Sequence, residues 1–165
     1  MPTLAQYPFL VILQKLARQK NIDIFLVGGF LRDALLDQNG HDFDFAVAKN
    51  ALTFSRLFAK QIKGAFVLLD KERGCGRVVK KYAHKIETYD FADLRAPTLK
   101  GDIAHRDFTI NTLTVKLNDL NLDEDFTKGI ADFCDGIKDL KARRLRIVSA
   151  KAFKEDPLRL MRAYS

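Results

Sequence analysis

The segment from residue 42 to residue 47 constrains the fold more than any other part of this chain, because aromatic and acidic residues alternate along it. Phe43 and Phe45 occupy every second position, and Asp42 and Asp44 stand beside them. Successive side chains of a β-strand point to opposite faces of its sheet. The alternation therefore predicts a strand with one face packed in a core and one acidic face.

Hydrophobic periodicity predicts the elements around this strand. Apolar residues at helical spacing predict helices near 8–20, 30–36, 51–62, 103–111 and 151–165, and short runs of β-forming residues predict strands near 22–27, 66–69, 77–82, 85–91, 112–117 and 144–148. The dipeptide Asn39-Gly40 predicts a turn before the acidic strand. Several strands have short connections and do not alternate regularly with helices. We therefore expect an α/β fold of the α+β type, with a mixed or antiparallel sheet and helices packed on it.

Length and composition indicate a single globular domain. The chain has 165 residues, of which 47% are hydrophobic and 30% are charged. No apolar run is long enough for a membrane span, and the N-terminus lacks the pattern of a signal peptide. Cys75 and Cys134 lie far apart, which argues against a disulfide framework or a zinc site. We expect a cytoplasmic protein with no membrane partner, whose oligomeric state the sequence does not reveal.

The basic character of the chain fits a polyanionic partner. The net charge is +7 and the pI is near 9.5. Positive side chains cluster at residues 80–85 and 138–146, where they could follow a phosphate backbone. A basic but solvated surface is an equally good interpretation of the charge alone.

Two local patterns point to phosphate and metal chemistry. In LVGGFLRDALL, Gly28 and Gly29 join a strand to a helix that carries Arg32 in its first turn, an arrangement that suits a phosphate group. The alternative is a tight turn with a solvated Arg32–Asp33 pair. The D-x-D strand then holds two carboxylates on one face, where they repel each other unless a cation such as Mg²⁺ lies between them. A solvent-facing strand edge is the alternative, but the joint pattern favours a metal site beside a triphosphate.

These motifs and two later ones resemble a known family. The segments LVGGFLRDALL, HDFDF, HRDFTINTL at 105–113 and EDPLRLMRA at 155–163 occur in this order. Together they resemble the head domain of class II CCA-adding tRNA nucleotidyltransferases and bacterial poly(A) polymerases, which belong to the DNA polymerase β superfamily. The segment LDKERGCGRVV at 69–79 resembles the mobile loop of this family. The resemblance implies the polymerase-β-like nucleotidyltransferase fold.

The resemblance also implies a catalytic centre with two Mg²⁺ ions. Asp42 and Asp44 would bind both ions, and a third carboxylate on a neighbouring strand would complete the site. Glu87 matches the acidic position of the family best, and Asp90 is the alternative. Glu87 could instead be an exposed strand carboxylate.

The nucleotide would be held by residues of several motifs. The expected set is Gly28, Gly29, Arg32, Asp33, Arg106, Asp107, Asn111, Asp156, Arg159 and Arg162. The resemblance implies that Arg106 contacts a phosphate and that Asp107 accepts a hydrogen bond from a ribose hydroxyl. Asn111, four residues later, would lie on the same helical face as Asp107. An exposed helix face around Asp107 and a salt-bridge row at 156–162 are the structural alternatives.

The resemblance implies a template-independent transferase. An RNA 3′-hydroxyl, most plausibly that of tRNA, would attack the α-phosphate of ATP or CTP, adding CCA, CC or A. Poly(A) addition is the alternative within the enzyme class, and a nucleotide- or RNA-binding module without turnover is the alternative outside it. His105, Ala92 and Ser165 depart from arginines that are common in the family, which motivates the last alternative.

The resemblance further divides the chain. Residues 1–150 would form the catalytic head, and 151–165 would begin a helical neck that is cut short, with the RNA-binding domains absent. The E-D-x-x-R motif that selects the base in this family is expected past Ser165.

Overall fold

The computed structural model describes residues 3–38 and 42–164. Along the chain the elements are α1 (Pro8–Lys20), β1 (Ile24–Val27), α2 (Gly29–Leu35), β2 (Asp42–Val47), α3 (Ala51–Ile62), β3 (Ala65–Asp70), β4 (Cys75–Lys81), β5 (Ile86–Asp93), α4 (Leu99–Ile103), the 3₁₀ turn η1 (Thr109–Asn111), β6 (Thr114–Lys116), η2 (Phe126–Gly129), β7 (Ile130–Ala131), α5 (Gly136–Lys141), α6 (Ala150–Glu155) and η3 (Pro157–Tyr164). The predicted Asn39-Gly40 turn and Ser165 lie outside the described residues.

One mixed sheet organises the chain. Its seven strands run in the order β3-β4-β5-β2-β1-β6-β7. The β2–β5 pair is parallel, and the other neighbouring strands pair in antiparallel fashion. The expected α/β fold with a mixed sheet and packed helices is therefore confirmed.

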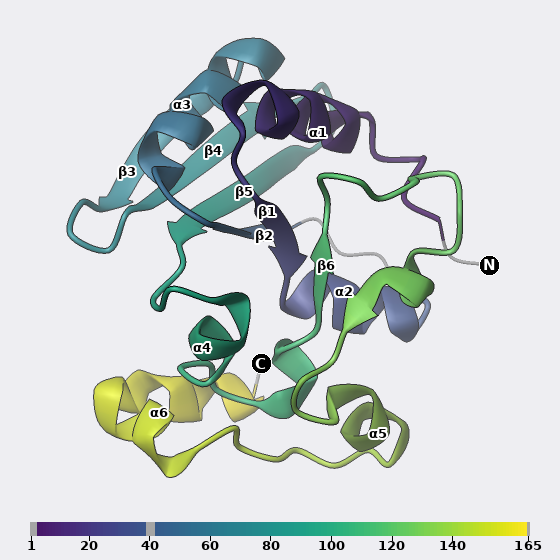
Figure 1. The fold of residues 1–165 in the computed structure, drawn as a ribbon, viewed down its shortest axis with the longest axis vertical. Coiled ribbons are helices and arrows are strands. Elements are labelled where there is room, and N and C mark those ends of the chain that lie inside the picture. The colour runs from purple at the N-terminus through teal and green to yellow at the C-terminus, as the bar shows by residue number, and fades with distance from the viewer. Residues whose placement is uncertain (1–2, 39–41, 165) are drawn as a thin grey trace.

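Helices α1 and α3 lie side by side over one face of this sheet, whereas α4, α5 and α6 gather at one end of it (Figure 1). Phe43 and Phe45 of β2 point into the core beneath α1 and α3 and are almost fully buried. The Phe43 ring lies 4.6 Å from that of Phe9 and 5.6 Å from that of Tyr89, measured between centroids. Burying one such ring contributes about 1.5–3 kcal/mol. This packing fixes which face of β2 its aspartates occupy.

The predicted helix at 103–111 is wrong. Helix α4 ends at Ile103, and Phe108 has an extended backbone conformation that forms an isolated antiparallel bridge with Ile147. The amide of Val148 donates to the carbonyl of Asp107 over 2.9 Å, and that of Thr109 donates to Arg146. The residues around 108 therefore bond to a distant segment in place of a helical neighbour. That segment, predicted as a strand at 144–148, contributes only this bridge.

The predicted helix at 151–165 is divided. Helix α6 stops at Glu155, Asp156 is extended with φ −151° and ψ 94°, and η3 starts at Pro157. Proline disfavours the helical conformation in the residue before it, which accounts for the break. The sequence patterns also missed η2, β7 and α5. No helix among residues 3–38 and 42–164 is both long and apolar enough to cross a membrane.

Candidate active site

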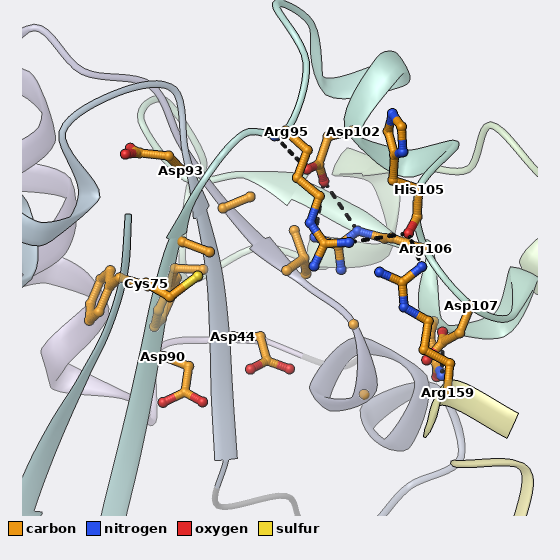
Figure 2. A pocket seen from close by; sticks show the side chains of 18 of the residues that line it. Asp44, Cys75, Asp90, Asp93, Arg95, Asp102, His105, Arg106, Asp107 and Arg159 are labelled. Atoms are coloured by element: carbon orange, nitrogen blue, oxygen red, sulfur yellow. Dashed lines mark hydrogen bonds and ion pairs between the residues drawn. The ribbon is translucent and has the colours of Figure 1, made fainter. Parts of the chain in front are cut away.

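Three aspartates share the sheet face opposite the aromatic core. The parallel register sets Asp44 beside Asp90 and Asp42 beside Thr88. The hydroxyl of Thr88 donates to Oδ1 of Asp42 over 2.5 Å. Since Phe43 and Phe45 point to the core, Asp42 and Asp44 both point away from it. Figure 2 shows Asp44 and Asp90 on neighbouring strands with their carboxylates directed to the same side.

The electrostatics of this face centre on Asp44. Burial raises the pKa of the Asp44 carboxyl, the charges of Asp90 and Asp42 raise it further, and Arg106 and Arg162 oppose the shift. Asp90 is itself bound at both oxygens by the guanidinium of Arg77, over 2.7 Å each. The face thus concentrates negative charge at Asp44 while part of the charge of Asp90 is already balanced.

The structure does not bring Glu87 to this face. Glu87 is 6% exposed and alternates with Asp90 along β5, so it points to the core side together with Tyr89. Its carboxylate accepts hydrogen bonds from Lys85 Nζ, over 2.6 Å, and from the Tyr89 hydroxyl. The Lys85 and Tyr89 bonds hold the pKa of Glu87 below its usual value although burial opposes them. Our choice of Glu87 as third carboxylate is corrected by this geometry, which puts the alternative, Asp90, beside Asp44.

The glycine turn touches the carboxylates directly. Gly28 has a φ of 78°, and its amide donates to the carbonyl of Leu113. A Cβ atom at Gly28 would lie 3.3 Å from Oδ2 of Asp44. Both Gly28 and Gly29 line the cleft beside these carboxylates. The backbone of the turn therefore forms one wall of the site.

Arg32 and Asp33 lie behind this wall. Arg32 Nε donates to Asp33 Oδ1 over 2.7 Å, and Arg32 Nη1 donates to Asn111 Oδ1 over 2.9 Å. Neither residue is among those that line the cleft. The predicted alternative, an Arg32–Asp33 pair, is present, but it is partly buried and tied to Asn111.

Arginines form the wall opposite the aspartates. Arg95, Arg106, Arg159 and Arg162 all line the cleft, and the first three gather on that side in Figure 2. The buried carboxylate of Asp102 accepts from Arg106 Nη2 over 3.2 Å and from the backbone amide of Arg95 over 3.0 Å. Burial and neighbouring guanidiniums lower the pKa of Arg95. Crowded positive charges of this kind suit a polyanionic ligand.

The sequence patterns did not identify Arg95 and Asp102. Ala92, where the family commonly has an arginine, lines the cleft without a charge, and Arg95 supplies a guanidinium from three residues later. His105, which stands where the family commonly has an arginine, contributes to the site through its backbone. Its backbone carbonyl accepts from Arg159 over 2.7 Å and from Arg95 over 3.3 Å, and the identity of its side chain does not affect these bonds.

Asp107 presents one buried oxygen without a hydrogen-bond donor. Its side chain is 4% exposed, and Oδ1 accepts from the Phe108 amide over 2.6 Å and from Asn111 Nδ2 over 3.2 Å. Oδ2 has no hydrogen-bond partner among the described residues, although Arg162 Nη1 lies 3.1 Å away as an ion pair. A buried acceptor of this kind costs stability unless a ligand supplies a donor.

The E-D-x-x-R motif expected past Ser165 is present within the chain. Glu155, Asp156 and Arg159 have this spacing. Arg159 is buried at the edge of the cleft and donates to the carbonyls of His105 and Ala152 over 2.7 and 2.8 Å. Asp156 accepts from the Leu158 amide and lies 3.7 Å from Arg159, without lining the cleft. A match to the motif expected past Ser165 thus lies within the chain, and the location of base selection stays a prediction.

Between its two walls the cleft encloses about 330 Å³, a volume in the range of small-molecule sites. Residues 24–146 match the family described as the poly A polymerase head domain. The chain belongs to this family. The resemblance drawn from the sequence motifs, and the polymerase-β-like fold that it implied, are confirmed.

Relatives of this head domain include tRNA nucleotidyltransferases of different specificity. The CC-adding tRNA nucleotidyltransferase of Geobacter sulfurreducens is 40% identical over 157 residues, which cover 95% of this chain and 34% of that protein. The A-adding tRNA nucleotidyltransferase of Aquifex aeolicus is 32% identical over 149 residues, covering 84% of this chain and 17% of that protein. The chain thus spans about a third or less of these relatives.

Solved structures place the head domain in the same group. The Thermotoga maritima CCA-adding enzyme complexed with tRNA superposes with a TM-score of 0.78 at 33% identity, over 94% of this chain and 36% of that chain. A complex of a CCA-adding enzyme with ATP gives a TM-score of 0.77 at 32% identity, over 94% and 36% of the two chains.

The donor set of the poly A polymerase head domain described here fits a magnesium ion. Within residues 3–38 and 42–164, no three His, Cys, Asp or Glu side chains form a ready metal-binding group. Mg²⁺ commonly takes only one or two protein carboxylates and completes its shell with water and substrate phosphates. Asp42 and Asp44 offer such a pair, and the negative charges around Asp44 would be relieved by a cation.

Proposed function

We propose that this chain is the catalytic head of a template-independent tRNA nucleotidyltransferase that adds CMP, AMP or both to an RNA 3′ end. The observation that carries the proposal is the pairing of two opposite walls in one cleft. Asp42, Asp44 and Asp90 stand on one sheet face, and a cluster of arginines faces them. Binding a triphosphate next to a metal requires both features in one place.

The reaction is a phosphoryl transfer with a simple atom balance. The oxygen of the RNA 3′-hydroxyl bonds to the α-phosphorus of ATP or CTP, and the bond from that phosphorus to the bridging oxygen breaks. Pyrophosphate leaves, and the hydroxyl proton is lost to solvent or base. Asp42 and Asp44 would hold two Mg²⁺ ions, which supply a lower pKa for the attacking hydroxyl and charge neutralisation for the leaving group.

The side chains of this chain position the nucleotide. Arg95 and Arg106 donate to phosphate oxygens, and Asp102 holds the guanidinium of Arg106 and the backbone of Arg95 at the cleft. Asp107 accepts a hydrogen bond from a ribose hydroxyl at Oδ2, which has an ion pair with Arg162 but no hydrogen-bond donor among the described residues. Gly28 and Gly29 let the backbone approach the phosphates closely.

Base selection is assigned to Asp156 and Arg159, two of the three charged members of the E-D-x-x-R motif. Arg159 reaches the edge of the cleft, and a guanidinium can recognise a base edge with two parallel donors. Among the described residues, Asp156 accepts a hydrogen bond from the Leu158 amide and lies 3.7 Å from Arg159 as an ion pair. It therefore retains acceptor capacity for an exocyclic amino group.

A tRNA substrate is supported by the relatives, which are named CC-adding and A-adding tRNA nucleotidyltransferases. Poly(A) addition is the second candidate, since the matching family is described by that activity. We place the enzyme in the cytoplasm, with residues 1–150 as its head and 151–165 as the start of a helical neck. This boundary stays a prediction.

The test is incorporation of labelled CTP and ATP by the full-length protein. The acceptors are tRNAs ending before CCA, after the first C and after the second C, with an unrelated RNA of equal length. A tRNA nucleotidyltransferase stops after a defined number of additions, whereas a poly(A) polymerase extends every acceptor with AMP. Asp42→Ala and Asp44→Ala should each lose at least ~3 kcal/mol of transition-state stabilisation, or about a hundredfold in rate. Absence of turnover with wild-type protein would favour a binding module.

A further inference from the structure

A cluster of ion pairs forms around one buried carboxylate, and its residues do not line the cleft. Asp139 of α5 has a side chain that is 0% exposed. Its Oδ1 accepts from Arg144, whose Nη2 lies 2.6 Å away, and its Oδ2 accepts from Arg146 Nε over 2.8 Å and from the Thr109 hydroxyl over 2.7 Å. The mechanism proposed above does not use this carboxylate, although its three partners occupy both of its oxygens.

The cluster connects two distant segments of the chain. Arg146 also donates to the carbonyl of Cys134 over 2.6 Å, so its side chain is anchored at both ends of the guanidinium. Its backbone carbonyl accepts from the Thr109 amide over 2.9 Å, and two residues later the Val148 amide donates to Asp107. Asp139 thus fixes the segment at 146–148, and that segment fixes the backbone on either side of Phe108.

A close contact adds a second link to the same place. A Cβ atom at Gly136, the first residue of α5, would lie 2.3 Å from the carbonyl oxygen of Thr109. That carbonyl also accepts from the Thr112 hydroxyl over 2.7 Å. Helix α5 is therefore pressed against η1 at the point where Asp139 bonds to Thr109.

The segment held in this way carries the nucleotide-facing groups. Oδ1 of Asp107 accepts from the Phe108 amide and from Asn111, whereas Oδ2 has an ion pair with Arg162 and no hydrogen-bond donor among the described residues. A rotation of the backbone at 107–109 would change which oxygen faces the cleft. The direction of Asp107 therefore depends on the position of Thr109.

We infer that Asp139, through Thr109 and Arg146, is a positioning residue that aims Asp107 at the ribose of the bound nucleotide. The inference rests on the ribose contact proposed for Asp107. It assigns to α5, which the sequence patterns missed, a role in selecting ribonucleotides over deoxyribonucleotides. Arg144 and Arg146, which the sequence grouped with a basic patch for RNA, are about half exposed and also pair with Asp139 in this cluster.

The experiment measures the ratio of kcat/KM for ATP to that for 2′-deoxy-ATP, in the full-length protein. A variant that merely folds less well has fewer active molecules, which lowers both constants equally and leaves the ratio unchanged. Asp139→Asn should lower the ratio at least fivefold. Thr109→Val, which keeps the ion pairs and removes only the hydroxyl donor, should lower it in the same direction, and Thr109→Ser, which retains the donor, should preserve the wild-type ratio.

The outcomes separate this inference from the proposal it rests on. Asp107→Asn tests the ribose contact itself and should abolish the discrimination. If Asp107→Asn abolishes discrimination while Asp139→Asn and Thr109→Val stay within twofold of wild type, the positioning role is refuted alone. A wild-type ratio near one that Asp107→Asn leaves unchanged would refute the ribose contact and the inference with it. Should Asp139→Asn fail to fold, the Thr109 pair decides.

Discussion

Gly28 and Gly29 are neighbours in the sequence, but replacing each by alanine should have opposite effects on stability. Gly28 has φ 78° and ψ −142°, a region essentially restricted to glycine, where another residue costs about 1–3 kcal/mol. Gly29 has no positive φ and begins α2. Alanine at a compatible position stabilises a protein by up to about 1 kcal/mol, because it reduces the entropy of the unfolded chain.

The contacts of the added methyl groups point the same way. A Cβ at Gly28 would lie 3.3 Å from Oδ2 of Asp44, tighter than an ordinary contact, and a Cβ at Gly29 would lie 3.5 Å from the flexible end of Arg32. Near this chain length about 1 kcal/mol corresponds to roughly 2–4 °C in Tm. Gly28→Ala should therefore lower Tm by about 2–12 °C, whereas Gly29→Ala should leave it unchanged or raise it slightly.

The assay combines thermal and urea unfolding of both variants with nucleotide incorporation by the full-length protein. Gly28→Ala should also lose activity beyond its folded fraction, because the methyl group displaces the Asp44 carboxylate. Equal Tm losses in the two variants would refute the argument from backbone conformation. A stable Gly28→Ala protein with normal turnover would refute the close packing of the turn on Asp44.

Three further predictions follow from the same site. The pKa of Asp44 is raised in the folded protein, so without Mg²⁺ the folded state loses stability as pH rises from the ordinary carboxyl pKa to the raised one. Asp44→Asn should therefore raise Tm at neutral pH, as measured by thermal unfolding scans without Mg²⁺. Glu87→Gln should keep activity per folded molecule within about threefold of wild type. Asp90→Asn should lose at least about tenfold in kcat/KM, because a loss of about 1.4 kcal/mol of transition-state stabilisation at the metal face lowers the rate tenfold. Equal losses in the two variants would restore Glu87 as the third carboxylate. RNA binding by residues 1–165 should be non-specific. The logarithm of the binding constant should fall with the logarithm of salt concentration with a slope of about −3, because segment 138–146 has three cations that Asp139 does not bind. Salt-insensitive, tRNA-selective binding would contradict this prediction.

The sequence predicted well those elements whose periodicity reflects burial on one face. Helices α1 and α3 have the predicted bounds of 8–20 and 51–62, because their apolar stripes pack on the sheet. Strand β2 also has the predicted alternation, with Phe43 and Phe45 inside. The failure at 103–111 occurs where backbone hydrogen bonds lead to distant residues. At Asp107 the partner is Val148, 41 positions away in the sequence numbering, and local spacing carries no information about such a partner.

The three carboxylates of the site show how much the sequence of a single strand can predict. Within β2 the aromatic residues reveal which face is buried, so the orientation of Asp42 and Asp44 follows from the sequence. Strand β5 carries acidic residues on both faces. Glu87 shares its face with the buried Tyr89 and Phe91, whereas Asp90 alternates with these aromatic residues. The alternation within β5 therefore already favours Asp90 for the face opposite the aromatic core. The pairing of Asp44 with Asp90 then brings the two carboxylates side by side, and that register is a property of two strands. Arg77 on β4 pairs with Asp90 because β4 and β5 continue the same face. The aspartate face is thus completed by strand pairing across β2, β5 and β4, whereas the match of single positions to a family motif located two of its members and misplaced the third.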